Sequence, residues 1–306
     1  MAIRLYENFR ALLYTPFFAA HALGAYEAEG VAVELKASPE PGLGARQVLA
    51  GEAELTWGGP MRVQHLHAQQ PDCGLVCFSE VIGRDPFSLV GRTPRPSFRL
   101  TDLADVTFGS VSEVPTPWLC LQDDIRRAGL DPTTLKHRVA DRSMADNLAA
   151  VIAGKLDAAQ LFEPYVTQAL DAGCHVWHAA ASRGVTAYTC FYTTRPTIER
   201  HRDEFRRMTR AIYRTQKWLH AQPPATIAAR VTSFFPDIPL GTLTTVIEHY
   251  LALGIWNKTP VLPQEGWDRL RDAVVSGGLV RQGIDYARGV DPTFAEQAVA
   301  DNPPSL

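Results

Sequence analysis

The chain has 306 residues, of which 46% are hydrophobic and 21% are charged, and its formal net charge is -3. This composition is typical of a globular protein that is long enough for two domains with cores of their own. The small negative charge and the lack of a basic stripe argue against nucleic-acid binding, and no apolar run approaches the ~18–20 residues of a membrane-spanning helix.

Residues 15–60 alternate between helical and extended patterns. An apolar run that begins at Phe17 has helical spacing, residues 31–35 alternate as in a strand, and residues 41–44 form a glycine turn before the next helix. Such alternation predicts a mostly parallel sheet flanked by helices. Ligands bind such sheets at the carboxyl ends of the strands, so we expect this region to contribute to a pocket.

Residues 48–55 and 151–158 share one order of elements, namely a helix end, a glycine and a short strand. Two such copies far apart in the chain suggest two lobes with related α/β topology. The alternative is that helix–glycine–strand units simply look alike.

The rest of the chain continues this alternation and then becomes helical. Strands are predicted at 77–80, 87–90, 106–111, 138–141, 174–177 and 186–193, and helices at 118–128, 144–153, 164–172, 195–221, 224–232, 240–253 and 264–275. We expect lobe 1 to comprise residues 1–91 and 195–306, and lobe 2 to comprise residues 92–194. Two connections between two lobes form a hinge, and hinged lobes can close on a ligand.

Candidate ligand contacts follow the first two strands of lobe 1. Tyr14 and Thr15 end the first strand, where the alternative roles are a packed aromatic ring and a helix cap. Gly42 and Gly44 lie in the glycine turn, which can present backbone N–H groups to an anion or a carbonyl oxygen. A tight turn that needs glycine is the alternative.

Trp57 and Gly58 end the third strand of lobe 1. An indole at this place can stack on a flat ring, and the glycine lets a ligand approach the backbone. The alternative is a tryptophan in the core of the lobe. Tyr188 is a further aromatic candidate, unless it only packs inward.

In lobe 2, Ser112 and Thr116 lie on a turn that opens a helix, and Glu113 between them is a candidate helix cap. Glu163 ends the strand of the second repeat copy. Its carboxylate can accept hydrogen bonds from an amine or a ring N–H of a ligand, or it can form a salt bridge.

The chain contains five cysteines at irregular spacing: Cys73, Cys77, Cys120, Cys174 and Cys190. An odd number at such spacing does not describe a disulfide framework. His65 and His67 are two apart on an expected helix, so their side chains diverge and make a poor metal pair. We expect bystander thiols, no metal site and no cofactor.

Several of these patterns, in this order, resemble a known family. The resemblance rests on the small-residue helix at 16–23, Gly24-Ala25-Tyr26, the strand 30–34, the glycine turn 42–44, the unit 48–55, and the segment 156–164 with its terminal Glu-Pro. These residues are similar to type II periplasmic binding proteins, in the branch for nitrate, sulfonate, taurine and thiamine-pyrimidine ligands. The resemblance covers roughly residues 3–275.

This resemblance implies a type II periplasmic-binding-protein fold with two hinged α/β lobes around a ligand cleft. The first functional hypothesis is the solute-binding protein of an ABC importer, without catalysis. Its ligand is expected to be a thiamine-type pyrimidine or similar heterocycle, or a sulfonate, and its partner the importer's permease. We expect a location outside the cytoplasmic membrane, periplasmic or lipid-anchored, with a leader absent from this sequence, or a cytoplasmic location if no leader exists.

The alternative is an enzyme on the same fold, either a relative of thiamine pyrimidine synthase or an aromatic-acid decarboxylase or desulfinase. The synthases carry a cysteine-rich stretch, and residues 188–192 resemble it only weakly because they contain one cysteine. This difference counts against pyridoxal phosphate chemistry. Cys190 or Cys120 would be the nucleophile of an enzyme. A cytoplasmic ligand sensor is a third hypothesis, which no DNA-binding segment supports.

Overall fold

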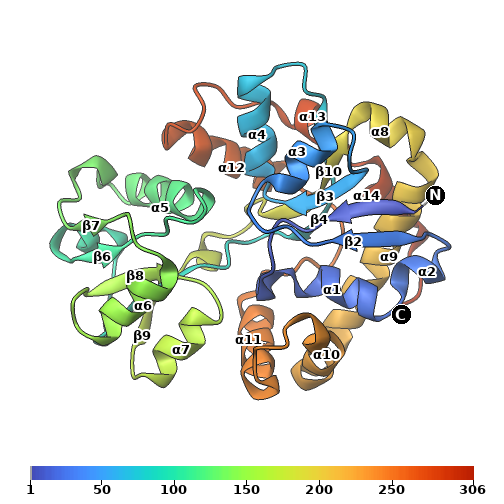
Figure 1. Cartoon of the computed structure of the whole chain (residues 1–306). Coiled ribbons are helices and arrows are strands. Elements are labelled where there is room, and N and C mark those ends of the chain that lie inside the picture. The colour runs from blue at the N-terminus through green and yellow to red at the C-terminus, as the bar shows by residue number, and fades with distance from the viewer. Residues whose placement is uncertain (1) are drawn as a thin grey trace.

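The computed structural model describes residues 2–306, and its two sheets form the centres of two lobes (Figure 1). The sheet of lobe 1 has the strand order β2-β1-β3-β10-β4. Its strands are β1 (Ile3–Tyr6), β2 (Val33–Lys36), β3 (Leu55–Gly58), β4 (Leu75–Ile82) and β10 (Thr189–Thr194). β1 is parallel to β2 and β3, whereas β10 is antiparallel to both β3 and β4.

The sheet of lobe 2 repeats this arrangement with the order β7-β6-β8-β5-β9. Its strands are β5 (Ser88–Gly91), β6 (Phe108–Gly109), β7 (Arg138–Val139), β8 (Ala158–Leu161) and β9 (His175–Ala179). β6 is parallel to β7 and β8, and β5 is antiparallel to β8 and β9. The predicted two-lobed α/β fold is confirmed, and each sheet is mixed because it contains one reversed strand.

The reversed strands are exchanged between the lobes. β5 directly follows the lobe 1 strand β4 but lies in the sheet of lobe 2, and β10 follows lobe 2 but lies in the sheet of lobe 1. The chain therefore crosses at residues 83–87 and 180–188, and the predicted boundaries after residues 91 and 194 lie one strand too late. The proline-rich residues 92–97 follow β5 inside lobe 2.

Helices cover both sheets (Figure 1). Lobe 1 has α1 (Thr15–Ala22), α2 (Ala25–Ala28), α3 (Leu43–Leu49) and α4 (Pro60–Gln69), and lobe 2 has α5 (Thr116–Arg127), α6 (Met144–Ile152) and α7 (Tyr165–Asp171). The chain then returns to lobe 1 with α8 (Arg195–Arg200), α9 (Arg202–Ala221), α10 (Pro224–Val231), α11 (Leu240–Leu253), α12 (Gln264–Ser276), α13 (Tyr286–Gly289) and α14 (Thr293–Asp301). Short 3-10 helices lie at Leu12–Tyr14, Leu100–Asp105, Pro132–Thr134, Ala180–Arg183 and Thr232–Phe234. Within residues 2–306, no helix combines the length and the apolar character needed to cross a membrane.

The two copies of the sequence repeat end their helices in the same way. α3 and α6 are followed by Gly51 and Gly154, which have φ angles of +73° and +71°. Each glycine N–H bonds to the carbonyl three residues earlier, on Val48 and on Val151. Only glycine adopts this left-handed conformation without strain, which explains why both copies carry it at the same place.

The acidic residue that precedes β3 or β8 also has the same role in both copies. The carboxylate of Glu54 accepts the backbone N–H of Arg4 at 2.8 Å, and that of Asp157 accepts the N–H of Thr107 at 2.8 Å. The first bond joins the start of β3 to β1, and the second joins the start of β8 to the start of β6. The two copies of the sequence repeat therefore share a hydrogen bond that helps to set the register of the strands.

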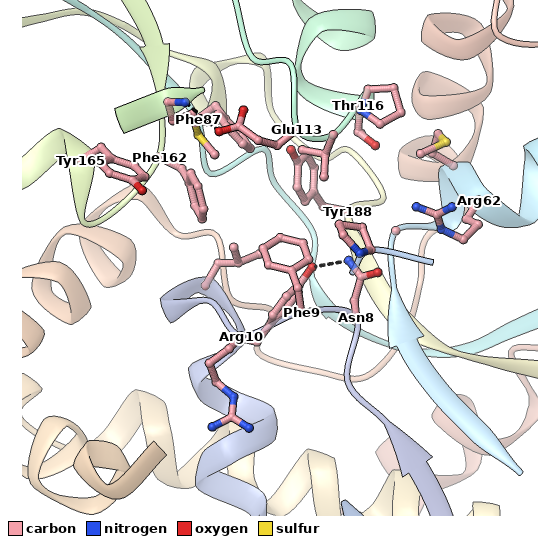
Figure 2. Close-up of a pocket in the computed structure, with 18 residues that line it drawn as sticks. Asn8, Phe9, Arg10, Arg62, Phe87, Glu113, Thr116, Phe162, Tyr165 and Tyr188 are labelled. Atoms are coloured by element: carbon pink, nitrogen blue, oxygen red, sulfur yellow. Dashed lines mark hydrogen bonds between the residues drawn. The ribbon is translucent and has the colours of Figure 1, made fainter. Parts of the chain in front are cut away.

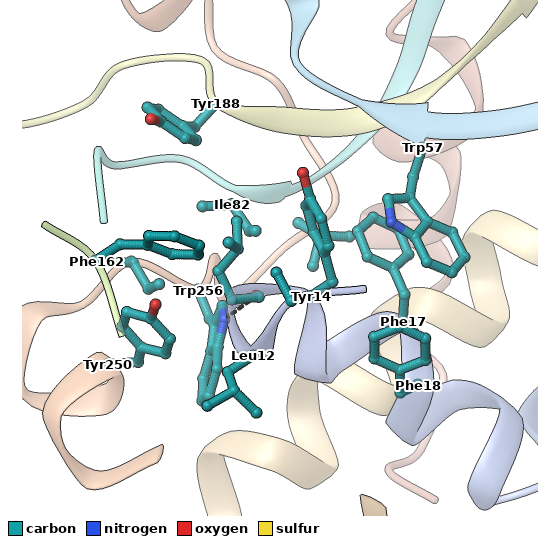
Figure 3. Close-up of a cluster of buried hydrophobic side chains, with 14 of the residues drawn as sticks. Leu12, Tyr14, Phe17, Phe18, Trp57, Ile82, Phe162, Tyr188, Tyr250 and Trp256 are labelled. Atoms are coloured by element: carbon teal, nitrogen blue, oxygen red, sulfur yellow. Dashed lines mark hydrogen bonds between the residues drawn. The ribbon is translucent and has the colours of Figure 1, made fainter. Parts of the chain in front are cut away.

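Figure 3 shows a cluster of buried side chains that includes Trp57, Phe17 and Phe18 of lobe 1. Trp57 is fully buried, and its indole stacks on Phe17 with a centroid distance of 4.6 Å and an interplanar angle of 3°. Phe18 contacts the same indole edge-on at 5.6 Å. The prediction that Trp57 stacks on a ligand is therefore wrong, because its faces are already covered by the phenylalanines of α1.

A buried ion cluster joins the two crossing segments. Arg183 in the second crossing bonds to Asp85 in the first at 3.0 Å, and to Asp124 on α5 at 2.8 Å. The side chain of Arg183 is only 4% exposed. This cluster holds both crossing segments against α5 of lobe 2.

Replacing Arg183→Met should lower the free energy of unfolding by about 3–5 kcal/mol, because two buried carboxylates lose their cation. Arg206→Met is the matched control, since Arg206 pairs with Asp203 at 2.8 Å on the surface and should contribute no more than about 1 kcal/mol. Urea unfolding measures both variants. Equal effects of the two substitutions would contradict the role of the cluster.

Gly44 is required for packing, because a Cβ at this position would lie 2.2 Å from Thr56 Oγ1 and 2.9 Å from Thr56 Cβ. Gly44→Ala should therefore destabilise the protein by about 1–3 kcal/mol, although alanine favours helices. Gly241→Ala on α11 is the control, since a Cβ there meets open space. A stabilised Gly44→Ala variant in thermal unfolding would show that the helix can shift away from β3.

Candidate functional site

A cavity of about 310 Å³ lies between the lobes, lined by side chains of both (Figure 2). In each lobe the lining residues follow the carboxyl ends of three mutually parallel strands, which are β1, β2 and β3 in lobe 1 and β6, β7 and β8 in lobe 2. Phe87 and Tyr188, on the two crossing segments, complete the wall. The carboxyl edges of two similar sheets therefore face one another across one cavity, which agrees with the sheet-edge expectation from the sequence.

Two arginines line this cavity, and one of them, Arg62, lies on the first turn of α4. Among residues 2–306, its guanidinium has neither a hydrogen-bond acceptor nor a carboxylate partner. It lies over Gly42, where a Cβ would come within 2.4 Å of the Arg62 guanidinium. Gly42 has a φ of +89°, so glycine here serves both the turn and the space that the arginine occupies.

Tyr14 is one of three tyrosines that line the cavity, with Tyr165 and Tyr188. Asn8 links Tyr14 to the glycine turn, because its Nδ2 donates to Tyr14 Oη at 3.0 Å and its Oδ1 accepts the Gly42 N–H at 3.3 Å. Burial raises the pKa of Tyr14 to about 12, so the hydroxyl keeps its proton and can donate it.

Tyr188 has a buried hydroxyl for which residues 2–306 supply no hydrogen-bond partner. Its side chain is 7% exposed, and burial raises its pKa well above the usual value. Buried polar groups without partners are rare in proteins. A protonated hydroxyl that lines a cavity and lacks a partner is therefore a candidate ligand contact.

The opposite side of the cavity is aromatic. Figure 2 shows Phe87, Phe162 and Tyr165 together, on the far side of the cavity from Arg62. The rings of Phe87 and Phe162 are 5.0 Å apart, and Phe162 contacts Tyr165 edge-on at 6.3 Å. Phe9, Leu13, Met61, Val114 and Met144 add further apolar surface.

The other charged groups at the cavity already have partners. Arg10 pairs with Glu7 at 2.8 Å. The Glu113 carboxylate accepts the N–H of Met144 at 2.7 Å, so it caps α6, whereas the sequence suggested a cap on the helix that follows its own turn, which is α5. Among the charged side chains that line the cavity, Arg62 is the one without a hydrogen-bond partner within residues 2–306, so it is the candidate contact for an anion.

Three of the predicted site residues line the cavity, namely Tyr14, Thr116 and Tyr188. Gly42 supports it from behind, through Asn8 and Arg62. Their role as ligand contacts stays a prediction, whereas their position beside the cavity is a feature of the fold.

The other predicted site residues have structural roles. Thr15 is fully buried, and its hydroxyl donates to the carbonyl of Leu12 at 2.7 Å, in the 3-10 turn that precedes α1. Gly44 packs on Thr56, and Gly58 lies under Tyr192, where a Cβ would be 3.2 Å from the ring. None of these predicted residues faces the cavity.

Two predicted site residues of lobe 2 also bond within the protein. Ser112 is exposed, and its hydroxyl donates to the carbonyl of Arg142 at 2.7 Å. Glu163 is buried and accepts a hydrogen bond from His249 at 2.8 Å, so its partner lies within the protein.

Sequence reasoning missed Arg62, Phe9, Phe87, Phe162 and Tyr165. Each lies within a few residues of a predicted strand end, and Phe162 and Tyr165 flank the predicted Glu163. The signal that was available is the repeat: Arg62 and Tyr165 occupy the same place after β3 and after β8.

The cysteines named as candidate nucleophiles lie away from the cavity. Cys120 and Cys190 are 1% and 0% exposed, and neither lines its wall. Burial raises the pKa of the Cys120 thiol to about 12 and that of the Cys190 thiol well above its usual value. Both thiols are protonated, so neither is activated for attack. Within residues 2–306, no cluster of three or more metal-ligating side chains is present.

Comparison with known proteins finds relatives that are named as binding proteins. The chain is 21% identical over 303 residues to YtlA of Bacillus subtilis (strain 168), which is provisionally named a binding protein, and the match covers 98% of this chain and 90% of YtlA. The periplasmic aliphatic sulphonate binding protein SsuA of Escherichia coli has a similar structure, with a TM-score of 0.75 at 17% identity, covering 94% of this chain and 96% of SsuA.

An enzyme shares the fold as well. A mutant of the desulfurization enzyme DSZB, solved in complex with biphenyl-2-sulfinic acid, has a TM-score of 0.66 at 11% identity, covering 98% of this chain and 100% of the enzyme. At such identities the solved structures establish the fold alone. The family model described as NMT1/THI5 like matches residues 13–226, and the chain therefore belongs to the NMT1/THI5-like family.

Proposed function

We propose that the protein is the solute-binding component of an ABC importer and that it binds a small organic anion, a sulfonate or a carboxylate, in the interlobe cavity. The observation that carries this proposal is the unpaired guanidinium of Arg62 in a cavity whose other walls are largely aromatic. The proposal includes a permease as partner and a location outside the cytoplasmic membrane, periplasmic or lipid-anchored.

The chemistry of the cavity favours a ligand with two different ends. An oxyanion can accept charge-assisted hydrogen bonds from Arg62 and further bonds from the hydroxyls of Tyr14 and Tyr188. The apolar end is then buried against Phe162 and Tyr165. A volume of about 310 Å³ is near the lower limit for ligand cavities, so the ligand is small.

This ligand class differs from the heterocycle that the sequence favoured. A neutral or basic aminopyrimidine would leave Arg62 buried under the ligand without a counter-charge, which is unfavourable. The relatives give independent support, since SsuA is named for aliphatic sulphonates and DSZB was solved with a sulfinic acid. Both ligands are sulfur oxyanions on an organic body.

Arg62→Gln should weaken the binding of benzenesulfonate by ~10–100-fold, because a charged hydrogen bond contributes about 1.5–3 kcal/mol. Arg62 makes no bond within residues 2–306, so the variant should keep the wild-type melting temperature. Isothermal titration calorimetry would compare benzenesulfonate, an alkanesulfonate, benzoate and an aminopyrimidine, with Arg206→Gln as the surface control. Tight binding of the aminopyrimidine alone, unaffected by Arg62→Gln, would overturn the anion proposal.

Tyr188→Phe should lower affinity for the same anion by ~10-fold or more, because it removes one donor to a charged group. The ligand-free protein should become no less stable, since the hydroxyl removed has no partner. Tyr26→Phe is the matched control, because Tyr26 also has a buried hydroxyl without a partner but does not line the cavity. Equal affinity losses in both variants would show that Tyr188 does not contact the ligand.

A further inference from the structure

The turn that follows β8 points its side chains in two directions. Phe162 and Tyr165 line the cavity, whereas Glu163 points away from it and is 3% exposed. One oxygen of Glu163 accepts the backbone N–H of Thr167 at 3.0 Å and the Thr167 hydroxyl at 2.8 Å. The other accepts Nδ1 of His249 at 2.8 Å.

The bond to His249 crosses between the lobes. Glu163 belongs to lobe 2, and His249 lies on α11, which packs in lobe 1 against α10. Figure 1 shows α7 facing α11 across the gap between the lobes. A bond of 2.8 Å between two lobes exists only near the lobe spacing of this structure, here called the closed spacing, so it stabilises this spacing over a wider one.

The segment around α11 also supports the other wall of the cavity. The indole N–H of Trp256 donates to the carbonyl of Leu13 at 2.9 Å, and Leu13 lines the cavity. Tyr250, next to His249, contacts Trp256 edge-on at 5.7 Å (Figure 3). One segment, residues 249–256, is thus bonded to the lobe 1 wall through Trp256 and to the aromatic lobe 2 wall through His249.

Behind the pair lies a second cavity of about 200 Å³, bordered by Glu163, His249, Val166 and Leu170. The pair is therefore not enclosed by packing on that side, and the His249 side chain is 34% exposed. Truncating His249 should remove the bond without opening a void in the core. An effect of such a variant can be assigned to the bond between the lobes.

We propose that Glu163 and His249 are positioning residues: their interlobe bond holds Phe162 and Tyr165 at the closed spacing and so sets ligand affinity, although neither residue touches the ligand. Only the part of this inference that concerns ligand affinity rests on the proposed function, whereas the part that concerns lobe spacing does not. The sequence analysis predicted that Glu163 contacts the ligand. Glu163 instead lies between Phe162 and Tyr165 in the turn after β8, so fixing Glu163 also fixes these two rings of the cavity wall.

The test uses the full chain and three substitutions on α11. His249→Ala removes the donor and should weaken benzenesulfonate binding about tenfold, which corresponds to about 1.4 kcal/mol. His249→Asn places an amide N–H where Nδ1 was, and should restore most of the affinity. Glu248→Ala, at an exposed neighbouring position, is the control and should bind like wild type.

A second readout does not depend on the ligand. In small-angle X-ray scattering without ligand, His249→Ala should have a larger radius of gyration than wild type, and His249→Asn should not. Unchanged affinity and unchanged radius of gyration in His249→Ala would overturn the inference. If the wild-type protein bound no anion, the proposed function would fail, while the scattering comparison would still decide whether the bond sets the lobe spacing.

Discussion

The exchange of one strand between the sheets is the constraint on which the rest of the structure depends. β5 completes the sheet of lobe 2 and β10 completes that of lobe 1, so the chain must cross twice between the lobes. The two crossings hold the sheets with their carboxyl edges facing each other. The cavity, with Phe87 and Tyr188 on the crossings themselves, is the direct consequence.

The features that the two lobes share determine the backbone framework, and the residues that differ between the two repeat copies determine the chemistry of the cavity. The glycine caps and the register-setting carboxylates are the same in both lobes, because each solves the same problem of backbone geometry. At the strand ends the copies diverge: the position after β3 carries Arg62, and the corresponding position after β8 carries Tyr165. One lobe supplies the cation and the other supplies the aromatic surface, which gives the cavity its two unlike ends.

Much of this could be predicted from the sequence, since the alternation of strand and helix and the repeat are local patterns. The partner of a reversed strand is not local, so β5 and β10 were assigned to the wrong lobes. Trp57 shows a second limit of sequence-based prediction. An indole at the end of a strand can contact a ligand or pack in the core, and its stacking on Phe17, which places it in the core, is visible only in the folded chain. Arg62 was missed because an arginine on an amphipathic helix is usually solvated, and its missing partner is a property of the folded chain.

The central claim is that one cavity holds an anion at Arg62 and an apolar body at Phe162 and Tyr165. A crystal structure of the protein with benzenesulfonate tests it most directly. The account predicts a sulfonate oxygen at hydrogen-bond distance, about 2.7–2.9 Å, from the Arg62 guanidinium, with the ring against the aromatic wall. A sulfonate bound outside the cavity, or a ring placed over Arg62 with the sulfonate directed toward Glu113, would contradict the account.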